Sequence, residues 1–273
     1  MRTLTAKRVR AYVWLTLLCI FAVLPVAYVF LLALQTNAEA AALPPTLFPA
    51  SPQFENFSVV AERMPLARYF YNSVVFSLST TVAVILTSLF AGYATTKLRM
   101  PGRQFIISMF VGGILIPPAI RAIPLYTMIA RLNLVDTWAG LSLPLMATGF
   151  GLFFMHQFLK TVPDSVVEAA RIDGCSESRI VLQIVGPLVL PALVTLFIYN
   201  FLFRWNGYLW PLVVTRRTWT TLPVGISVFK TSEQLITWNL IAAAAVVTLI
   251  PVLGLFFAVG GRIVKGIAMQ ASK

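Results

Sequence analysis

The feature that most constrains this chain is a series of long apolar segments that contain almost no charge. Between Ala11 and Leu34 there is no charged residue at all. A helix of roughly 20 apolar residues crosses a bilayer core about 30 Å thick, and in lipid only helices and closed barrels pair all of their backbone polar groups. The segments are too long and too uniformly apolar for barrel strands. The sequence therefore predicts an all-α, polytopic membrane protein.

Composition supports this interpretation. The chain is 59% hydrophobic and only 11% charged, whereas a soluble domain has about 25% charged residues. There are too few polar side chains to cover a globule in water.

About six transmembrane helices are predicted, within a single transmembrane domain covering residues 1–273. The predicted spans are about 11–34, 70–95, 105–120, 138–158, 188–203 and 240–259, with a polar stretch at 160–187. The first is expected to be an uncleaved helix, because it far exceeds the 7–15 apolar residues of a signal peptide. The third is expected to break near Pro117-Pro118.

Loop charges predict the orientation. Cytoplasmic loops of membrane proteins are enriched in Lys and Arg, and the loop after the second span contains Lys97, Arg99 and Arg103 without an acid. With the N-terminus inside, thirteen Lys and Arg residues fall on the inner side and eight on the outer side. Both termini and the 160–187 stretch are therefore predicted to be cytoplasmic. The net charge of +12 reflects this bias, and no nucleic-acid partner is expected.

Catalytic and cofactor motifs are absent from the sequence. His156 is the single histidine and the two cysteines, Cys19 and Cys175, lie far apart, so no metal site is predicted. A phosphate-binding P-loop needs G-x-x-x-x-G-K-[ST], and the nearest approach, from Gly225 to Lys230-Thr231, lacks the second glycine. The chain is not expected to be an enzyme or to bind a cofactor.

The polar stretch at 160–187 contains a predicted short helix. Ser165 and Glu168 have the spacing of a capping box, in which each side chain pairs a free backbone N–H at the helix start. Gly174 is placed to end the helix in the left-handed conformation. The small apolar surface of this helix is expected to let another protein approach closely; its residues are Val166, Val167, Ala169, Ala170 and Ile172.

This stretch resembles the "EAA" loop of permeases from binding-protein-dependent ATP-binding-cassette (ABC) importers. Glu168-Ala169-Ala170 is followed after three residues by Gly174, and then by Ile184 and Pro187. Two positions depart from the usual pattern, since Gly186 stands where Leu is usual and Cys175 where Ala is common.

The resemblance extends over nearly the whole chain and is strongest to the carbohydrate-uptake branch. In detail the chain is similar to the second permease subunits of maltose, trehalose and glycerol-3-phosphate importers. The motifs that match this branch are Asn72-Ser73, Ala91-Gly-Tyr-Ala94 with Pro101-Gly102, Pro117-Pro118 with Pro124, Asp136-Thr137, Trp205-Asn206 and Lys265-Gly266. The stretch Ala139-Gly-Leu-Ser-Leu-Pro-Leu-Met146, with Trp238-Asn239 and Thr248-Leu-Ile-Pro251, most resembles the glycerol-3-phosphate permeases.

The resemblance implies the type I ABC importer permease fold, in the bacterial cytoplasmic (inner) membrane. It also implies a second, homologous permease, two ATPase subunits that bind ATP and Mg, and an extracytoplasmic solute-binding protein. The short helix would be the coupling helix, which contacts one ATPase subunit. The residues implied in coupling are Ser165, Val166, Glu168, Ala169, Ala170, Asp173 and Gly174.

Polar residues at membrane depth are costly and tend to line a transport pathway. Helix–helix hydrogen bonding is an equally good explanation for each of them. The pathway candidates are Asn72, Ser73, Ser77, Asn200, Arg204, Asn206 and Asn239.

Two alternatives remain open at this stage. An ion-coupled secondary transporter usually carries Asp, Glu or His inside the membrane, whereas the acids of this chain lie in predicted loops. An intramembrane enzyme would need catalytic residues within the spans, where only Arg204 and His156 are chargeable candidates. The solute itself, whether a sugar or a glycerol phosphate or its diester, is not identified by the sequence.

Overall fold

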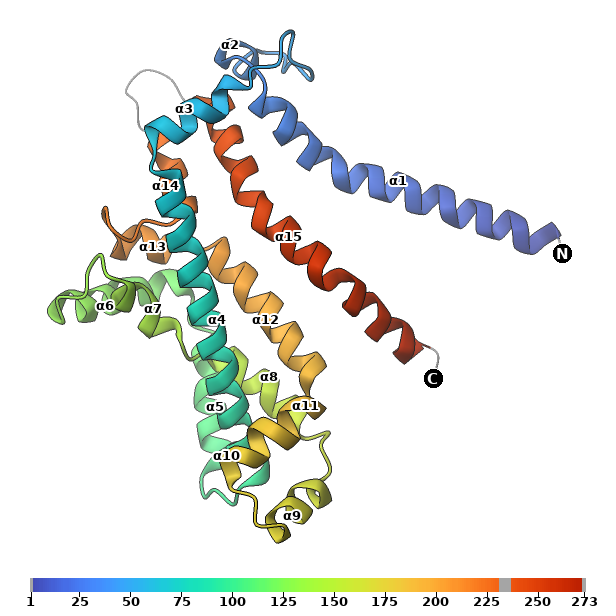
Figure 1. The fold of residues 1–273 in the computed structure, drawn as a ribbon, viewed down its shortest axis with the longest axis vertical. Coiled ribbons are helices and arrows are strands. Elements are labelled where there is room, and N and C mark those ends of the chain that lie inside the picture. Colours follow the sequence, from blue (N-terminus) through green and yellow to red (C-terminus); the bar gives the residue numbers. More distant parts are fainter. Residues whose placement is uncertain (1, 231–236, 272–273) are drawn as a thin grey trace. The chain divides into compact units, whose positions relative to one another are not determined.

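The computed structural model describes residues 2–230 and 237–271, and within this part every regular element is a helix (Figure 1). The all-α expectation is confirmed. The chain forms two compact units, Met1–Leu66 with Gly225–Ile263, and Ala67–Val224 with Val264–Lys273.

The first unit is held together by a buried asparagine. Its Asn56 side chain donates from Nδ2 to the carbonyl oxygens of Ala33 and Gln35, each at 2.9 Å, and its Oδ1 accepts from Asn239 Nδ2 at 3.0 Å. Three distant segments therefore meet at one side chain. The elements of this unit are α1 (Arg2–Ala33), α2 (Asn37–Ala40), α3 (Glu55–Arg63), η3 (Ile226–Lys230) and the first part of α15 (Trp238–Ala271).

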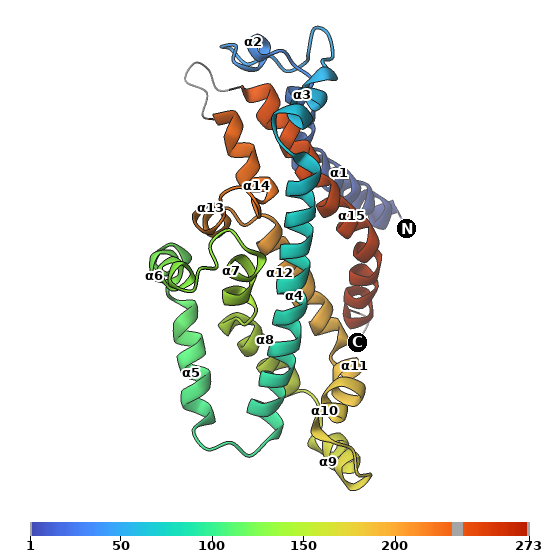
Figure 2. The same cartoon turned by 60° about the vertical axis from the view of Figure 1, so that its left-hand side comes forward.

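The second unit is organised along α4 (Leu66–Lys97), which is an unbroken helix (Figures 1 and 2). The other elements are α5 (Arg103–Ile114), α6 (Pro118–Arg131), α7 (Trp138–Ser142), η1 (Leu143–Leu145), α8 (Gly149–Leu159), α9 (Asp164–Ile172), α10 (Glu177–Arg179), the π-helix η2 (Ile180–Val185), α11 (Gly186–Leu188), α12 (Leu190–Trp205), α13 (Leu209–Val214) and, at the boundary between the units, α14 (Leu222–Gly225).

Three pairs of apolar helices in this unit are bent. The bends are 103° between α5 and α6, 41° between Trp138–Leu145 and α8, and 87° between Glu177–Leu188 and α12. The predicted break near Pro117-Pro118 is confirmed, because Pro117 is extended (ψ 138) and α6 begins at Pro118. Proline has no backbone N–H to donate and is therefore well placed at the first position of a helix.

Length and composition identify α1 from Lys7 and α4 as helices able to cross a membrane, and up to five such spans if each bent pair counts as one. A shorter apolar helix, Trp238–Gly254, is the first part of α15. The exact limits of the six predicted spans stay predictions.

The helices α4 and α8 approach closely through a glycine. A Cβ atom added at Gly92 would lie 2.9 Å from Met155 Cβ and 2.9 Å from Leu159 Cδ1, which is too short for a real contact. Close approach through small residues is typical of helix pairs in membranes. On the same side, Thr95 Oγ1 and His156 Nδ1 lie 3.0 Å apart, which adds a buried polar contact between the two helices.

Two hydrophobic clusters lie at opposite ends of α4. The first joins Leu89 and Tyr93 of α4 to α8, α9, η2 and α12. The second joins Phe76 of α4 to Ile129, Leu141 and Val214. Figures 1 and 2 both show α9 beyond the end of α4 that carries the first cluster.

Candidate functional site

The candidate site is α9, and its start differs from the sequence prediction. Pro163 is the N-cap, with ψ 138, and no side chain caps the helix. Ser165 is therefore already inside the helix, where it cannot act as the cap of a capping box with Glu168. The prediction of a capping box was wrong because the fixed φ of Pro163, followed by an extended ψ, makes the turn into the helix two residues earlier.

The end of α9 confirms the expectation for Gly174, which has φ +78. Its N–H donates to the Arg171 carbonyl at 3.0 Å, and the Cys175 N–H donates to the Ala170 carbonyl at 3.0 Å. These two bonds are those of a Schellman motif, with Asp173 as the C-cap residue. The last carbonyl groups of the helix are therefore paired without any side chain.

One face of α9 is buried in the core, and the other face is exposed. Val167 and Ala170 are buried in the cluster with Leu89 and Tyr93 of α4. The predicted apolar surface is therefore only partly available to another protein, because Val167 and Ala170 pack inside this chain. The exposed residues of α9 and its end are Asp164, Ser165, Glu168, Ala169, Arg171, Ile172, Asp173 and Gly174, while Val166 is half-buried. Ile172 is 87% exposed and adds a large apolar side chain to this outer face.

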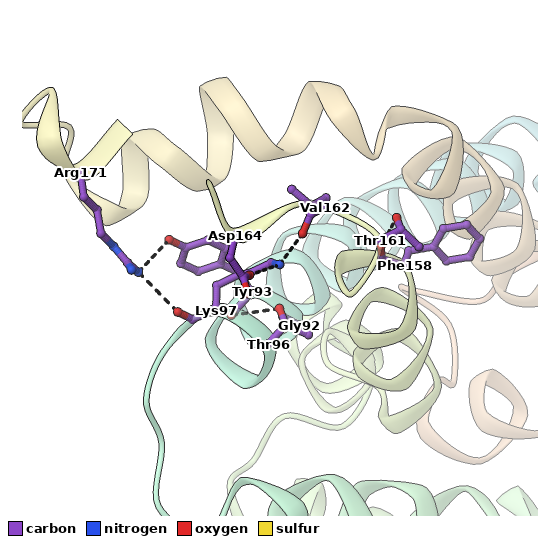
Figure 3. Close-up of polar contacts among 9 residues, drawn as sticks. All are labelled: Gly92, Tyr93, Thr96, Lys97, Phe158, Thr161, Val162, Asp164 and Arg171. Carbon is purple, nitrogen blue, oxygen red and sulfur yellow. Dashed lines mark hydrogen bonds and ion pairs between the residues drawn. The ribbon is translucent and has the colours of Figure 1, made fainter. Parts of the chain in front are cut away.

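The start of α9 is tied to the end of α4 by Lys97 (Figure 3). Lys97 Nζ lies 2.6 Å from Asp164 Oδ1 and also donates to the Val162 carbonyl oxygen. The Lys97 side chain is only 5% exposed, while that of Asp164 is 76% exposed. The hydrogen bond and then the charge of Lys97 lower the pKa of Asp164, so this carboxylate stays ionised well below neutral pH.

The end of α9 is tied to the same helix by Arg171. Its Nε lies 2.7 Å from Glu177 Oε1, and its Nη2 donates to Tyr93 OH at 3.4 Å and to the Lys97 carbonyl oxygen at 3.5 Å (Figure 3). Tyr93 OH in turn donates to the Glu177 carboxylate. The hydrogen bond with Glu177 raises the pKa of Arg171, and the bonds from Arg171 and then Tyr93 lower the pKa of Glu177.

We call these contacts the α4–α9 clasp, formed by Tyr93, Lys97, Asp164, Arg171 and Glu177. The clasp was not predicted from the sequence. Lys97 was considered only as a loop charge, and Tyr93 only as part of a motif. The one available signal was the spacing of Leu89, Tyr93 and Lys97, which are four residues apart and share one face of α4.

A second polar centre at the other end of α4 was also missed. Asp136, at φ +58, accepts hydrogen bonds from the backbone N–H groups of Arg216, Arg217, Thr218 and Trp219 at 2.8–3.1 Å. Partial burial works to raise its pKa, and these four amides outweigh burial and lower the pKa to about 2. Successive amides that surround an anion in this way form a nest.

Two of the pathway candidates on α4 hold the segment that Asp136 binds. Asn72 Nδ2 donates to the carbonyl oxygens of Thr218 at 3.0 Å and Thr220 at 2.9 Å, and Ser73 Oγ accepts from the Leu222 N–H at 2.8 Å. Both side chains are buried. Their contacts are those of helix–loop packing. Ser77 is fully buried, and its Oγ has no partner.

The other candidates have different environments. Asn200 is buried and bonds its own helix at Leu196, and Asn206 is exposed and bonds Leu202. Arg204 is 9% exposed; its Nη2 donates to the Leu145 carbonyl at 3.3 Å, and its Nε has no partner. No carboxylate of residues 2–230 or 237–271 forms an ion pair with it. The remaining candidate, Asn239, bonds Asn56 as described above.

With this geometry in view, comparison with known proteins decides the family. The profile of the family described as "Binding-protein-dependent transport system inner membrane component" matches residues 84–268. The chain belongs to this family. The match includes the second half of α4, the clasp and α9.

Relatives of this permease align along nearly their whole length. The chain is 35% identical over 251 residues to the sn-glycerol-3-phosphate transport system permease protein UgpE of Escherichia coli O1:K1 / APEC. This alignment covers 89% of each chain. The proteins of the same name from Shigella flexneri serotype 5b (strain 8401) and Salmonella choleraesuis (strain SC-B67) are 35% and 34% identical, with the same coverage.

A solved structure shares the fold of the permease. The crystal structure of a bacterial ABC transporter involved in the import of the acidic polysaccharide alginate contains a chain with a TM-score of 0.79. The two are 21% identical, and the alignment covers 96% of this chain and 98% of that chain. The predicted permease fold is confirmed.

Family membership settles the broad function. The chain is the non-catalytic membrane permease subunit of an ABC importer, and ATP hydrolysis belongs to a separate subunit. It acts in a membrane together with a partner permease, an ATPase and a solute-binding protein. The secondary-transporter and intramembrane-enzyme alternatives are therefore excluded.

Proposed function

We propose that the permease moves a sugar or glycerol-phosphate-type solute into the cytoplasm. We further propose that α9 is its coupling helix and contacts one of two ATPase subunits. These ATPase subunits bind ATP and Mg. The observation that carries the proposal is the two-sided environment of α9. Val167 and Ala170 anchor it in the core, while Glu168 and Ala169 face outward on a short helix that extends beyond α4. The proposed contact set is Ser165, Val166, Glu168, Ala169, Ala170, Asp173 and Gly174, in which Ala170 acts by supporting the helix from the buried side.

The solute class rests on similarity and on one buried charge. The relatives named above are glycerol-3-phosphate permeases. Arg204 is a buried guanidinium without a carboxylate partner among the described residues, and an unpaired buried charge is costly. An anionic solute such as a glycerol phosphate would supply the missing countercharge while it passes Arg204. Asn200 and Asn206, on either side of Arg204 in the chain, complete this part of the proposed pathway.

The proposed topology follows the loop charges. The permease forms one transmembrane domain of six spans in the bacterial cytoplasmic membrane, with α9 and both termini in the cytoplasm. The segment near Asp136 and Arg216 then faces outward, toward the binding protein. A second, homologous permease would complete the pathway.

Crosslinking tests the coupling role. In a chain with Cys19→Ala and Cys175→Ala, we introduce a single cysteine as Ala169→Cys or, as the control, as Glu55→Cys. Both positions are exposed. In the assembled complex, a thiol-to-amine crosslinker should join residue 169, and not residue 55, to an ATPase subunit. An active complex in which residue 169 fails to reach the ATPase, or residue 55 reaches it, would overturn the assignment.

Uptake by proteoliposomes that contain the complete complex tests the solute class. Glycerol-3-phosphate is expected to be accumulated, and Arg204→Gln should slow its uptake more than Asn206→Ala does. Equal uptake by Arg204→Gln and the wild-type protein would remove Arg204 from the pathway.

A further inference from the structure

We propose that α4 transmits the displacement of α9 to the opposite end of the second unit, and that the clasp residues are positioning residues that make α9 and the end of α4 move as one body. This inference rests on the proposed role of α9 in coupling. It concerns contacts inside this chain, whereas the coupling proposal concerns contacts with the ATPase.

The first support is that the clasp ties both ends of α9 to a single helix. Lys97 binds Asp164 and the Val162 carbonyl at the start of α9, and Arg171 reaches Tyr93 OH and the Lys97 carbonyl from its end. Between them, Val167 and Ala170 pack in one cluster with Leu89 and Tyr93 of α4, which also includes residues of α8, η2 and α12. A helix held at two ends and along its buried face has no hinge of its own toward α4.

The second support is that α4 is one unbroken helix where its neighbours are bent. Within the described part of the second unit, α4 is the one apolar helix long enough to span a membrane without a break, and the other candidates bend by 41° to 103°. A bent pair can absorb movement at its break. An unbroken helix without proline passes the same movement along its axis.

The third support lies at the far end of α4. Asn72 and Ser73 bond the backbone of residues 218–222. This segment overlaps residues 216–219, whose amides donate to Asp136. From Asn72 to Lys97 the helix rises about 38 Å at 1.5 Å per residue. In the proposed topology this far end faces the binding protein, so α4 links the surface where that protein docks to the surface where the ATPase docks.

Coupling between two sites requires an element whose displacement both sites sense. Spatial continuity alone does not demonstrate it, so the experiment measures coupling directly. The complete complex is reconstituted with ATPase subunits and binding protein, and three quantities are measured: ATPase subunits retained, stimulation of ATP hydrolysis by the loaded binding protein, and uptake of solute.

The test variant is Lys97→Gln, and the matched control is Arg99→Gln. The control removes one positive charge two residues further on, from an exposed side chain outside the clasp. Lys97→Gln should retain its ATPase subunits and lose stimulation and uptake by about tenfold or more. Arg99→Gln should stay within about twofold of wild type. Coupled uptake by Lys97→Gln within twofold of wild type, or loss of its ATPase subunits, would overturn the inference.

A chemical rescue separates coupling from folding. With Cys19 and Cys175 replaced by Ala, the pair Lys97→Cys and Asp164→Cys removes the ion pair and allows a short bifunctional methanethiosulfonate to bridge the two positions. Bridging of the assembled complex should restore most of the lost uptake, and reduction should abolish it again. Persistent inactivity of the fully bridged complex would mean that α9 must move relative to α4, contrary to the inference.

The two proposals fail in different ways. If residue 169 does not crosslink to the ATPase, the coupling role of α9 fails. If residue 169 crosslinks normally while Lys97→Gln transports normally, only the role of α4 fails.

Discussion

Replacement of Gly174 by Leu should abolish transport without removing the protein from the membrane. Gly174 has φ +78, a backbone conformation that costs a residue with a Cβ atom about 1–2 kcal/mol. A Cβ atom at this position meets no atom within 4 Å, so it causes no clash within this chain. The strain acts on the Schellman motif, where the N–H groups of Gly174 and Cys175 pair the last carbonyls of α9.

The chain offers a closely matched control in Gly102. It has φ +75, and an added Cβ there also meets nothing within 4 Å. Gly102→Leu therefore imposes a similar backbone strain in the loop between α4 and α5, at the start of α5 and outside α9. If strain alone mattered, the two variants would behave alike.

The assay combines membrane abundance, co-purification of the ATPase subunits and solute uptake. Both variants should be present in similar amounts, and Gly102→Leu should transport within about twofold of wild type. Gly174→Leu should lose at least about tenfold in uptake, through failed ATPase docking or failed transmission. Equal transport by the two variants would refute the argument that the end of α9 forms a contact surface.

Four further predictions concern the Asp136 and Asn56 contacts and the orientation of the chain. Asp136→Asn keeps the shape of the side chain and its tolerance of positive φ but removes the charge that binds four amides, so thermal unfolding in detergent should show a loss of about 1–3 kcal/mol; an unchanged Tm would contradict the nest. Because the pKa of Asp136 is lowered to about 2, its contribution should be complete above pH 4 and disappear only as the pH falls toward 2, and a loss between pH 7 and 5 would contradict this. Asn56→Ala should destabilise the first unit by about 1–3 kcal/mol by leaving buried carbonyls unpaired, whereas Asn206→Ala, at an exposed site, should change stability by less than about 0.5 kcal/mol. A membrane-impermeant thiol reagent should label Cys175 in inverted vesicles only, and labelling in intact spheroplasts would reverse the proposed orientation.

Features that depend on neighbouring residues were predicted well from the sequence. The left-handed end of α9 at Gly174 and the break before Pro118 both follow from what glycine and proline do to their own backbone. The capping box predicted at Ser165 is absent for a local reason as well, because Pro163 takes the N-cap position and starts the helix two residues earlier.

Features that depend on residues distant in the sequence were not predicted. Lys97 and Asp164 are 67 residues apart, and Asp136 lies 80 or more residues from the amides it binds. The periodicity of an apolar helix shows which face is buried but not which helix covers it. The same limit explains why Asn72 and Ser73 were considered pathway residues: burial of a polar side chain is visible in the pattern, whereas its partners at 218–222 are not.

The central claim is that this chain is a transport subunit that works only with separate ATPase subunits. The most direct measurement is ATP-dependent uptake by proteoliposomes that contain this chain alone, the membrane subunits without the ATPase, or the complete complex with its binding protein. We expect no ATP hydrolysis and no accumulation in the first two preparations, and both in the third. ATP turnover or solute accumulation by a pure preparation of this chain alone would show that it does not depend on separate ATPase subunits.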